Sequence, residues 1–222
     1  DDATPSAWVE RLYNGMREVC EKQHISLMGG NITHGKTLSL TATVVGESPD
    51  KVIYRNGAGV GNIVAVTGDM GSACVARLLL KNGHKPPVYC FDRLARPTAR
   101  VAEGIFLKDY ATSMIDISDG IASEARHLAR QSHCGVDIIA EKIPLHSTAK
   151  DVEATLPVTL VECALRGGED YELMFTVPAD RWQDLLKAWT FETLITAIGT
   201  MTDGDDYLLI QKGQKNPLPR GF

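Results

Sequence analysis

Residues 113–132, SMIDISDGIASEARHLARQS, join a predicted strand to a predicted helix and so decide the fold class of the chain. Apolar side chains carry SMIDIS as a strand, and DGIASEARHLARQS has the pattern of a helix. The carboxylates of Asp116 and Asp119 and the hydroxyl of Ser118 stand where this strand ends. An unpaired carboxylate at the edge of a core is costly, so we expect these groups to have a specific partner.

Strand and helix patterns alternate from residue 63 onward. Predicted strands cover residues 63–68, 113–118, 135–141, 171–177, 194–201 and 207–211. Predicted helices cover residues 72–83, 97–110, 119–132 and 179–189. Strands mixed with helices predict an α/β (α+β) domain with one sheet.

The first fifty residues hold too few elements for an independent domain. The patterns predict a helix over residues 5–23 and strands over residues 24–30 and 36–47. One helix on two strands buries little apolar area. Pro, Asp, Asn and Gly in residues 48–62 indicate a domain boundary. We therefore expect residues 1–53 to be the remainder of a first domain and residues 54–222 to form a complete second one.

Composition and charge argue against several classes of function. The 222 residues are 44% hydrophobic and 23% charged, with a net charge of −5 and no block of lysine or arginine. This argues against nucleic acid and anionic membranes as partners. No apolar run is long enough to span a bilayer, and no signal peptide opens the sequence. Five scattered cysteines without a C-x-x-C pair indicate free thiols, so we expect a cytoplasmic location.

The acidic strand end has two interpretations. A strand end beside a helix N-terminus offers N–H groups to phosphate oxygens, and Mg²⁺ would compensate the charge of Asp116 and Asp119. This interpretation predicts a site for a Mg²⁺–nucleotide complex. Alternatively, Ser118 or Asp119 simply caps the following helix.

Two further stretches carry polar residues in unusual arrangements. ALRGGEDYELMFTVP, residues 164–178, places two glycines and the acids Glu169, Asp170 and Glu172 before an apolar strand. It is either part of a site or a solvated loop that leads into an alternating strand. MGGNITHGK, residues 28–36, has a glycine pair that suits either close approach to a ligand or a tight turn.

Taken in order, these stretches resemble the thiamine-monophosphate kinase family of the aminoimidazole-ribonucleotide-synthetase-like superfamily. The resemblance rests on GGN, RNGAGVGNIVAVTGDMG, RPTARVAEG, MIDISDGIASEARHLA and ALRGGEDYELMFTVP. It implies two α/β domains, the first of which pairs in a homodimer, and ATP in a cleft with several Mg²⁺ ions. It also implies phosphorylation of thiamine monophosphate by ATP in thiamine biosynthesis, by direct in-line transfer without a phospho-enzyme. We name no catalytic base, because a substrate phosphate oxygen is already ionised near neutral pH.

The resemblance assigns roles to eight positions. By the resemblance, Mg²⁺ is bound by Asp116, Asp119 and Asn31. ATP is bound by Gly30, Asn31, Arg55 and Ser118, and the substrate is contacted by Glu169 and Phe222. The family pattern has Asp where this chain has Asn31, and a neutral amide predicts weaker metal binding there.

The family's front segment, with further metal-binding aspartates, is absent from these 222 residues. We therefore expect turnover in a full-length chain and none in residues 1–222 alone. Two other functions stay open. One is a non-catalytic nucleotide-binding relative, and the other is a sister ATP-dependent enzyme that acts on another small substrate.

Overall fold

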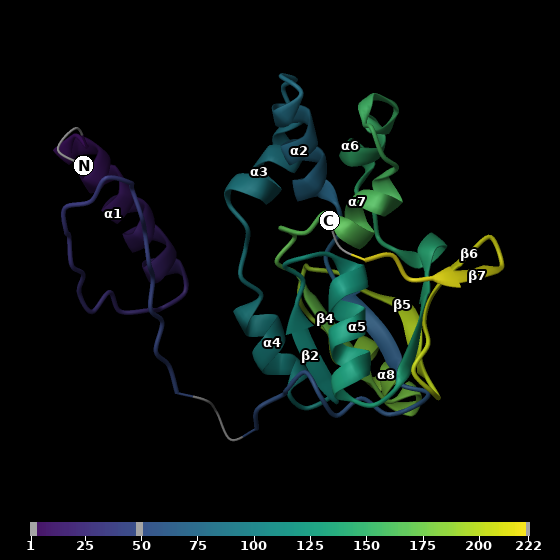
Figure 1. The fold of residues 1–222 in the computed structure, drawn as a ribbon. Helices are drawn as coiled ribbons and strands as arrows, with labels where there is room; N and C mark the ends of the chain where they lie inside the picture. The colour runs from purple at the N-terminus through teal and green to yellow at the C-terminus, as the bar shows by residue number, and fades with distance from the viewer. Residues whose placement is uncertain (1–3, 48–50, 221–222) are drawn as a thin grey trace. The chain divides into compact units, whose positions relative to one another are not determined.

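The computed structural model describes residues 4–47 and 51–220 of the chain. The chain divides into two compact units, Asp1–Pro49 and Asp50–Phe222, and each is described by itself. Figure 1 colours the first unit purple to blue and the second from blue to yellow. None of the helices in the described ranges is both long and apolar enough to cross a membrane.

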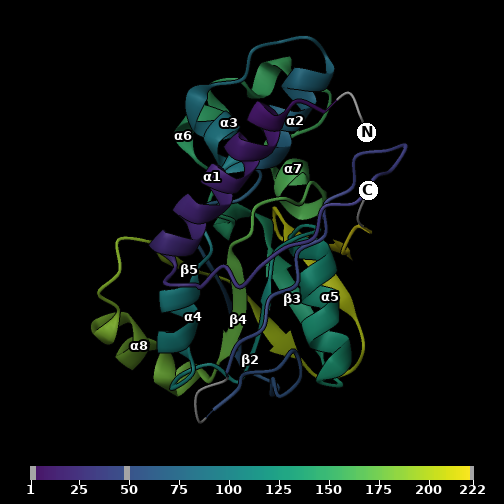
Figure 2. The same ribbon diagram turned by 90° about the vertical axis from the view of Figure 1, so that its left-hand side faces the viewer.

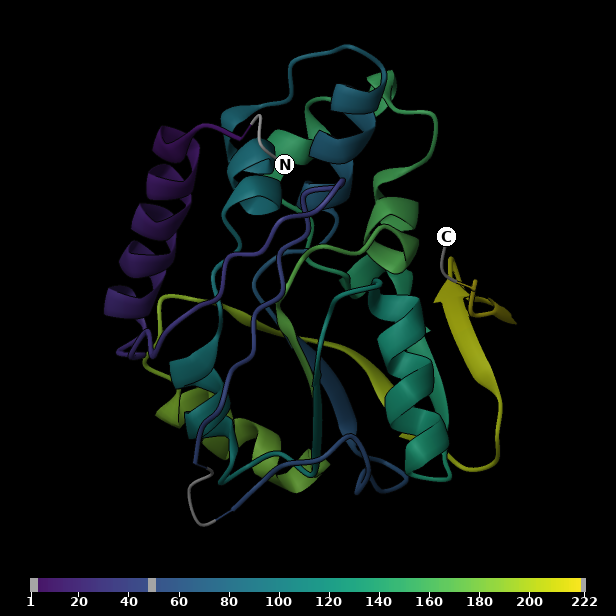
Figure 3. The ribbon, with the colours of Figure 1, turned by 60° about the vertical axis from the view of Figure 1, so that its left-hand side comes forward.

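The second unit is built on one seven-stranded sheet in the order β2-β4-β1-β5-β3-β6-β7. All neighbouring strands are antiparallel except β3 and β6, which are parallel, so the sheet is mixed. The strands are β1 (Ile63–Thr67), β2 (Ser113–Asp116), β3 (Gly135–Ile139), β4 (Leu173–Val177), β5 (Ile195–Thr202), β6 (Tyr207–Gln211) and β7 (Gln214–Pro217). Figure 3 shows β6 and β7, in yellow, at the edge of the sheet beyond α5.

Helices cover both faces of this sheet. The helices of the second unit are α2 (Ser72–Lys81), α3 (Val88–Ala95), α4 (Val101–Leu107), α5 (Ile121–Gln131), α6 (Ser147–Lys150), α7 (Leu160–Arg166) and α8 (Trp182–Ala188). In Figure 2, α4 and α8 lie to the left of the strands and α5 to the right. Short 3-10 turns occupy Ala140–Lys142, Glu153–Thr155 and Ala179–Arg181.

Strand β1 shows how the sequence produces these layers. Successive side chains of a strand point to opposite faces. Val64 and Val66 accordingly join a core cluster with the apolar side of α5, and Ala65 joins another cluster with Leu107 of α4 and Leu185 of α8. The apolar run of β1 is thus the signature of a strand that is covered on both faces.

The remaining helices gather at one end of the sheet, at the top in Figure 1. Here α2, α3, α6 and α7 share a third cluster, which includes Cys74, Leu79, Cys90 and Leu160. All five cysteines of the chain are free thiols.

The first unit contains α1 (Ser6–Lys22), which confirms the predicted helix. The strands predicted over residues 24–30 and 36–47 are wrong, because no strand occurs in the described residues 4–47. Alternation alone does not make a strand, since a ladder needs a hydrogen-bonded partner, and neither segment finds one there.

In the second unit every predicted strand is present, with shifted ends. The sequence patterns missed β7, α3, α6 and α7, although Thr159 and Glu162 form a capping box at the start of α7. The helix predicted over residues 97–110 is shorter, Val101–Leu107. Residues 97–100 of the predicted range are not helical.

Candidate active site at one end of the sheet

Three strand ends meet where the candidate site lies. Both β1 and β2 pair antiparallel with β4, so they run in the same direction. The carboxyl ends of β1 and β2 therefore lie beside the start of β4, where Asp116 pairs with Leu173. This geometry brings the two acidic motifs, residues 116–119 and 169–172, to the same end of the sheet.

The two motifs are hydrogen-bonded to each other beyond the regular strands. The Ile117 N–H donates to the carbonyl of Glu172 at 2.7 Å, and the Tyr171 N–H donates to the carbonyl of Ile117 at 2.9 Å. The Glu169 N–H donates to the carbonyl of Ser118 at 2.9 Å. The segment after β2 and the segment before β4 therefore form one structural unit.

Gly168 permits this close pairing. Its φ is +65°, and a Cβ there would lie 2.3 Å from the Ser118 carbonyl oxygen. The next residues are strained, because Glu169 and Tyr171 have φ values of 66° and 50° without being glycine. Strain of this kind is found where surrounding contacts fix the backbone, often at functional sites.

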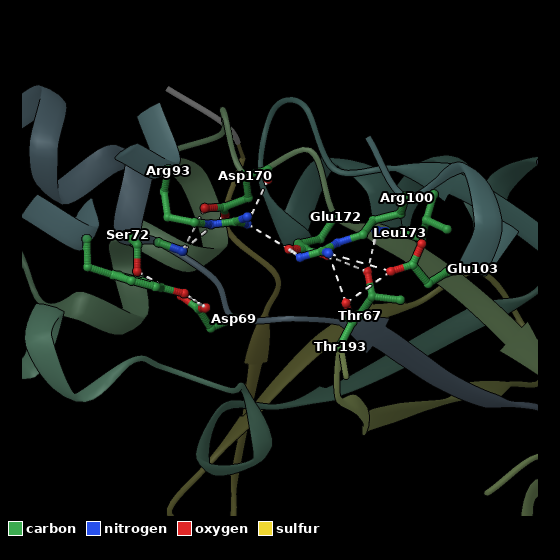
Figure 4. A network of polar contacts seen from close by, with 12 residues as sticks. Thr67, Asp69, Ser72, Arg93, Arg100, Glu103, Asp170, Glu172, Leu173 and Thr193 are labelled. Carbon is green, nitrogen blue, oxygen red and sulfur yellow. Dashed lines mark hydrogen bonds and ion pairs between the residues drawn. The ribbon is translucent and has the colours of Figure 1, made fainter. Parts of the chain in front are cut away.

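Glu172 lies in a buried network at this end of the sheet (Figure 4). Arg100 donates to its carboxylate twice, with Nε–Oε2 at 2.7 Å and Nη2–Oε1 at 2.6 Å. Arg93 donates to the same carboxylate at 2.8 Å, and the Thr67 hydroxyl donates at 2.6 Å. The hydrogen bonds with Glu172 raise the pKa of Arg100. Glu172 thus ties β1 and β4 to α3 and to the start of α4.

Asp170 is the second buried acid of this network. Both of its carboxyl oxygens lie 3.0 Å from the Gly71 nitrogen, whose N–H donates to them. Arg93 donates to the Asp170 backbone carbonyl at 3.0 Å. Burial raises the pKa of Asp170 to about 8, so the carboxyl holds its proton at neutral pH. Asp170 therefore fixes the loop after β1 through Gly71. Beside it, the Ser72 hydroxyl donates a hydrogen bond to the Asp69 carboxylate at 2.8 Å.

Asp116, Asp119 and Glu169, in contrast, are exposed. Burial raises the pKa of Tyr171, followed by a hydrogen bond with Glu169 and by the negative charges of Glu169, Asp116 and Asp119. The charges of all three carboxylates therefore act on Tyr171. Among the described residues, no lysine or arginine forms an ion pair with Asp116 or Asp119.

The helix-capping interpretation of this motif is wrong. Helix α5 has Gly120 at its N-cap position and no side-chain cap. The Glu124 carboxylate instead reaches back and accepts the N–H groups of Ser118 at 3.1 Å and Asp119 at 2.8 Å. This leaves the Asp119 carboxylate available for a ligand.

A cavity of about 580 Å³ opens beside the paired motifs. Such a volume is typical of a small-molecule site. Its lining comprises Arg77, Ser118, Asp119, Ser123, Arg166, Gly167 and Glu169. Three predicted site residues, Ser118, Asp119 and Glu169, are thus brought together. The sequence patterns did not identify the two arginines, because each falls within or at the end of an ordinary helix.

Other predicted site residues lie elsewhere. Arg55 is exposed and follows Tyr54, whose carbonyl accepts the N–H of Met114 at the free edge of β2. Gly30 and Asn31 belong to the first unit, where they line a cavity of about 890 Å³ with side chains of α1. Phe222 lies outside the described residues.

The acidic strand end fits a magnesium ion only in part. Mg²⁺ prefers one or two carboxylates together with phosphate oxygens and water, and Asp116 and Asp119 offer two exposed carboxylates. Across residues 4–47 and 51–220, however, no three His, Cys, Asp or Glu side chains form a group that could hold a metal ion. A metal here would need ligands from a nucleotide or water.

Comparison with known proteins places the chain in a family. Residues 59–211 match the family model "AIR synthase related protein, C-terminal domain", and residues 2–48 match "AIR synthase related protein, N-terminal domain". Thiamine-monophosphate kinase of Aquifex aeolicus is 34% identical over 203 residues, covering 90% of this chain and 64% of that protein. Thiamine-monophosphate kinase of Methanopyrus kandleri is 32% identical over 214 residues, covering 96% and 65%.

A solved structure, "AaThiL complexed with AMPPCP and TMP", has the same fold with a TM-score of 0.78 and 29% identity. It covers 99% of this chain, which spans 69% of that structure. The chain thus spans slightly less than two thirds of the two curated relatives and matches both family models in order. The protein belongs to the AIR synthase related protein family.

Proposed function

We propose that this chain is part of a kinase that transfers the γ-phosphoryl group of ATP to thiamine monophosphate and releases thiamine diphosphate and ADP. The observation that carries the proposal is the cavity at the sheet end, where Ser118, Asp119 and Glu169 from two paired motifs share one lining. The similar thiamine-monophosphate kinases support the choice of reaction. So does the complex with AMPPCP and TMP.

The exposed acids have a distinct part in this proposal. Asp116 and Asp119 would hold Mg²⁺ together with phosphate oxygens. Asn31, in the first unit, is a Mg²⁺ ligand by the resemblance. A bound Mg²⁺ supplies positive charge that screens the repulsion between donor and acceptor phosphates. Ser118 and Arg55 contact ATP, since a hydroxyl and a guanidinium both donate to phosphate oxygens.

The acceptor site in this proposal needs no base. A phosphate monoester carries about −1.5 to −2 charge near pH 7, so its oxygen is already a nucleophile. Glu169 contacts the substrate, and Phe222 adds an aromatic contact by the resemblance. Residues 1–53 belong to a domain that binds nucleotide through Gly30 and Asn31 and pairs in a homodimer.

The experiment uses the complete gene product with Mg²⁺, ATP and thiamine monophosphate. We expect thiamine diphosphate and ADP in equal amounts, followed by phosphorus NMR, with loss of turnover in Asp119→Asn. Absence of thiamine diphosphate while both substrates bind would contradict the proposal and favour a non-catalytic relative. Turnover with a different small acceptor alone would identify a sister enzyme instead.

A further inference from the structure

The turn between β2 and α5 is held by a carboxylate from the helix that follows it. Oε1 of Glu124 accepts the Asp119 N–H at 2.8 Å and the Ser118 N–H at 3.1 Å. The Ser118 hydroxyl lies 3.4 Å from the same oxygen as a further donor. Glu124 is only 1% exposed, so its carboxylate belongs to the interior of the unit. One buried oxygen therefore accepts several polar hydrogens of the turn that carries Asp119.

The backbone around this turn is closely packed. Gly120 has a φ of +100°, and a Cβ there would lie 2.8 Å from the Leu165 carbonyl oxygen. The Gly120 carbonyl accepts the N–H groups of Ser123 at 3.1 Å and of Glu124 at 3.3 Å. This packing and the Glu124 carboxylate together fix the backbone from which the Asp119 side chain projects.

Glu124 also changes what the turn can bind. Backbone N–H groups at the start of a helix ordinarily favour an anion such as phosphate. Here the N–H groups of Ser118 and Asp119 already donate to an anion that belongs to the chain. A phosphate that approached them would meet the negative charge of Glu124, whereas a divalent cation would be attracted by it. The charge of Glu124 thus acts in the same direction as the charges of Asp116 and Asp119.

The cavity lining contains positive charge that Glu124 offsets. Arg77 and Arg166 line the same cavity as Asp119, and their guanidinium groups oppose the binding of a divalent ion. Because Glu124 is buried, water and salt screen its charge less than they screen the exposed Asp116 and Asp119. A buried acid next to the turn therefore contributes to the attraction of a cation in spite of the arginines.

We propose that Glu124 is a positioning residue that makes this turn favour a cation over an anion and keeps phosphate away from its N–H groups. The inference rests on the proposed function, because it explains why the nucleotide phosphates reach this turn through Mg²⁺. Glu124 contacts neither the nucleotide nor the metal. It acts through the backbone of Ser118 and Asp119 and through its charge.

Equilibrium binding to the complete gene product tests this role with two probes, Mg²⁺–ATP and ATP in an excess of chelator. Glu124→Gln keeps the length of the side chain and an oxygen that accepts an N–H group, but it removes the charge. We expect Mg²⁺–ATP to bind this variant about fivefold or more weakly than the parent. Metal-free ATP should bind as tightly as in the parent or more tightly, because the repulsion of phosphate is lower.

Glu124→Asp separates the charge from the fit of the side chain. Asp keeps the charge but is shorter, so its preference for Mg²⁺–ATP over metal-free ATP should stay nearer to that of the parent than the preference of Glu124→Gln. A purely structural role predicts the opposite order, because Gln matches the length of Glu and Asp does not. The matched control is Glu162→Gln at the start of α7, where the carboxylate accepts the Thr159 N–H at 2.9 Å. This control should change neither affinity.

Three results would overturn the inference. They are equal affinity for Mg²⁺–ATP in the parent and Glu124→Gln, a parallel loss for both probes in that variant, and a parent that does not prefer the metal complex. If the preference falls as expected but the complete gene product makes no thiamine diphosphate, only the proposed function fails.

Discussion

Two sets of acidic side chains lie at the same end of the sheet and differ in their burial and in their polar partners. Asp170 and Glu172 are buried, with exposed fractions of 0% and 1%, and arginine, hydroxyl and N–H groups surround them. Asp116 and Asp119 are exposed and have no cationic side chain paired with them in the described residues. Glu169 shares the exposed side, one residue away from Asp170.

The difference in burial separates acids that stabilise the structure around the site from acids that are available to bind a ligand. A buried carboxylate stays only when protein groups satisfy it, so Asp170 and Glu172 need no ligand. Exposed carboxylates without a paired cationic side chain are open to a metal ion or another ligand. In GGEDYEL, Glu169 and Tyr171 are exposed whereas Asp170 and Glu172 are buried, so one short segment supplies both kinds of acid.

The largest effect is expected for Glu172→Ala. Its side chain is 1% exposed, and its partners Arg93 and Arg100 are 11% and 16% exposed. Removing the carboxylate leaves two nearly buried cations without their shared partner. We expect the free energy of unfolding to fall by about 3–5 kcal/mol in urea titrations.

Glu169→Ala is the matched control for this comparison. It removes an exposed acid from the same segment and should change the unfolding free energy by no more than about 0.5 kcal/mol. Similar losses in both variants would show that burial does not separate the two sets.

Arg55→Ala probes the exposed edge of β2. If Arg55 donates to an ATP phosphate, its loss should weaken binding of Mg²⁺–ATP by about 1.5–3 kcal/mol, measured by calorimetry. Arg130→Ala, which removes an exposed arginine elsewhere, should have no effect. Equal affinity in Arg55→Ala and the parent would remove Arg55 from the nucleotide site.

Asp170→Asn tests the buried set through pH. Burial raises the pKa of the folded Asp170 carboxyl to about 8, whereas the unfolded carboxyl loses its proton near its ordinary pKa of 3.8. Between these limits the folded state binds more protons, so the contribution of Asp170 to stability falls as pH rises. From about pH 6 to about pH 7 the parent should lose up to about 1.4 kcal/mol relative to Asp170→Asn.

Exposed Asp180 provides the control, since Asp180→Asn should follow the parent through the same pH range. An identical pH slope in the parent and Asp170→Asn would show that Asp170 is ionised in the folded protein.

The sequence predicted the second unit better than the first for a physical reason. β1 finds partners on both sides within the chain, so its apolar pattern and its structure agree. Residues 36–47 have an equally clear alternation but no partner in the described part of their unit, and they remain outside any strand. An alternating pattern shows that a segment is able to form a strand. Whether the strand forms depends on a hydrogen-bonded partner elsewhere in the fold.

The candidate site was predicted in part for a similar reason. Asp119, Ser118 and Glu169 stand out because polar residues interrupt apolar patterns. Glu172 and Arg100 meet only through folding, since 72 residues separate them. Arg77 belongs to an ordinary helical pattern, so the neighbouring sequence does not predict that it lines the cavity.

The most direct test of the contrast between the two sets is Asp119→Asn with two readouts on the same sample. Calorimetry gives the affinity for Mg²⁺–ATP, and urea titration gives the free energy of unfolding. We predict that affinity falls at least about tenfold while the unfolding free energy changes by no more than about 0.5 kcal/mol. Unchanged affinity, or a loss of stability comparable to that of Glu172→Ala, would contradict the assignment of the exposed acids to a ligand.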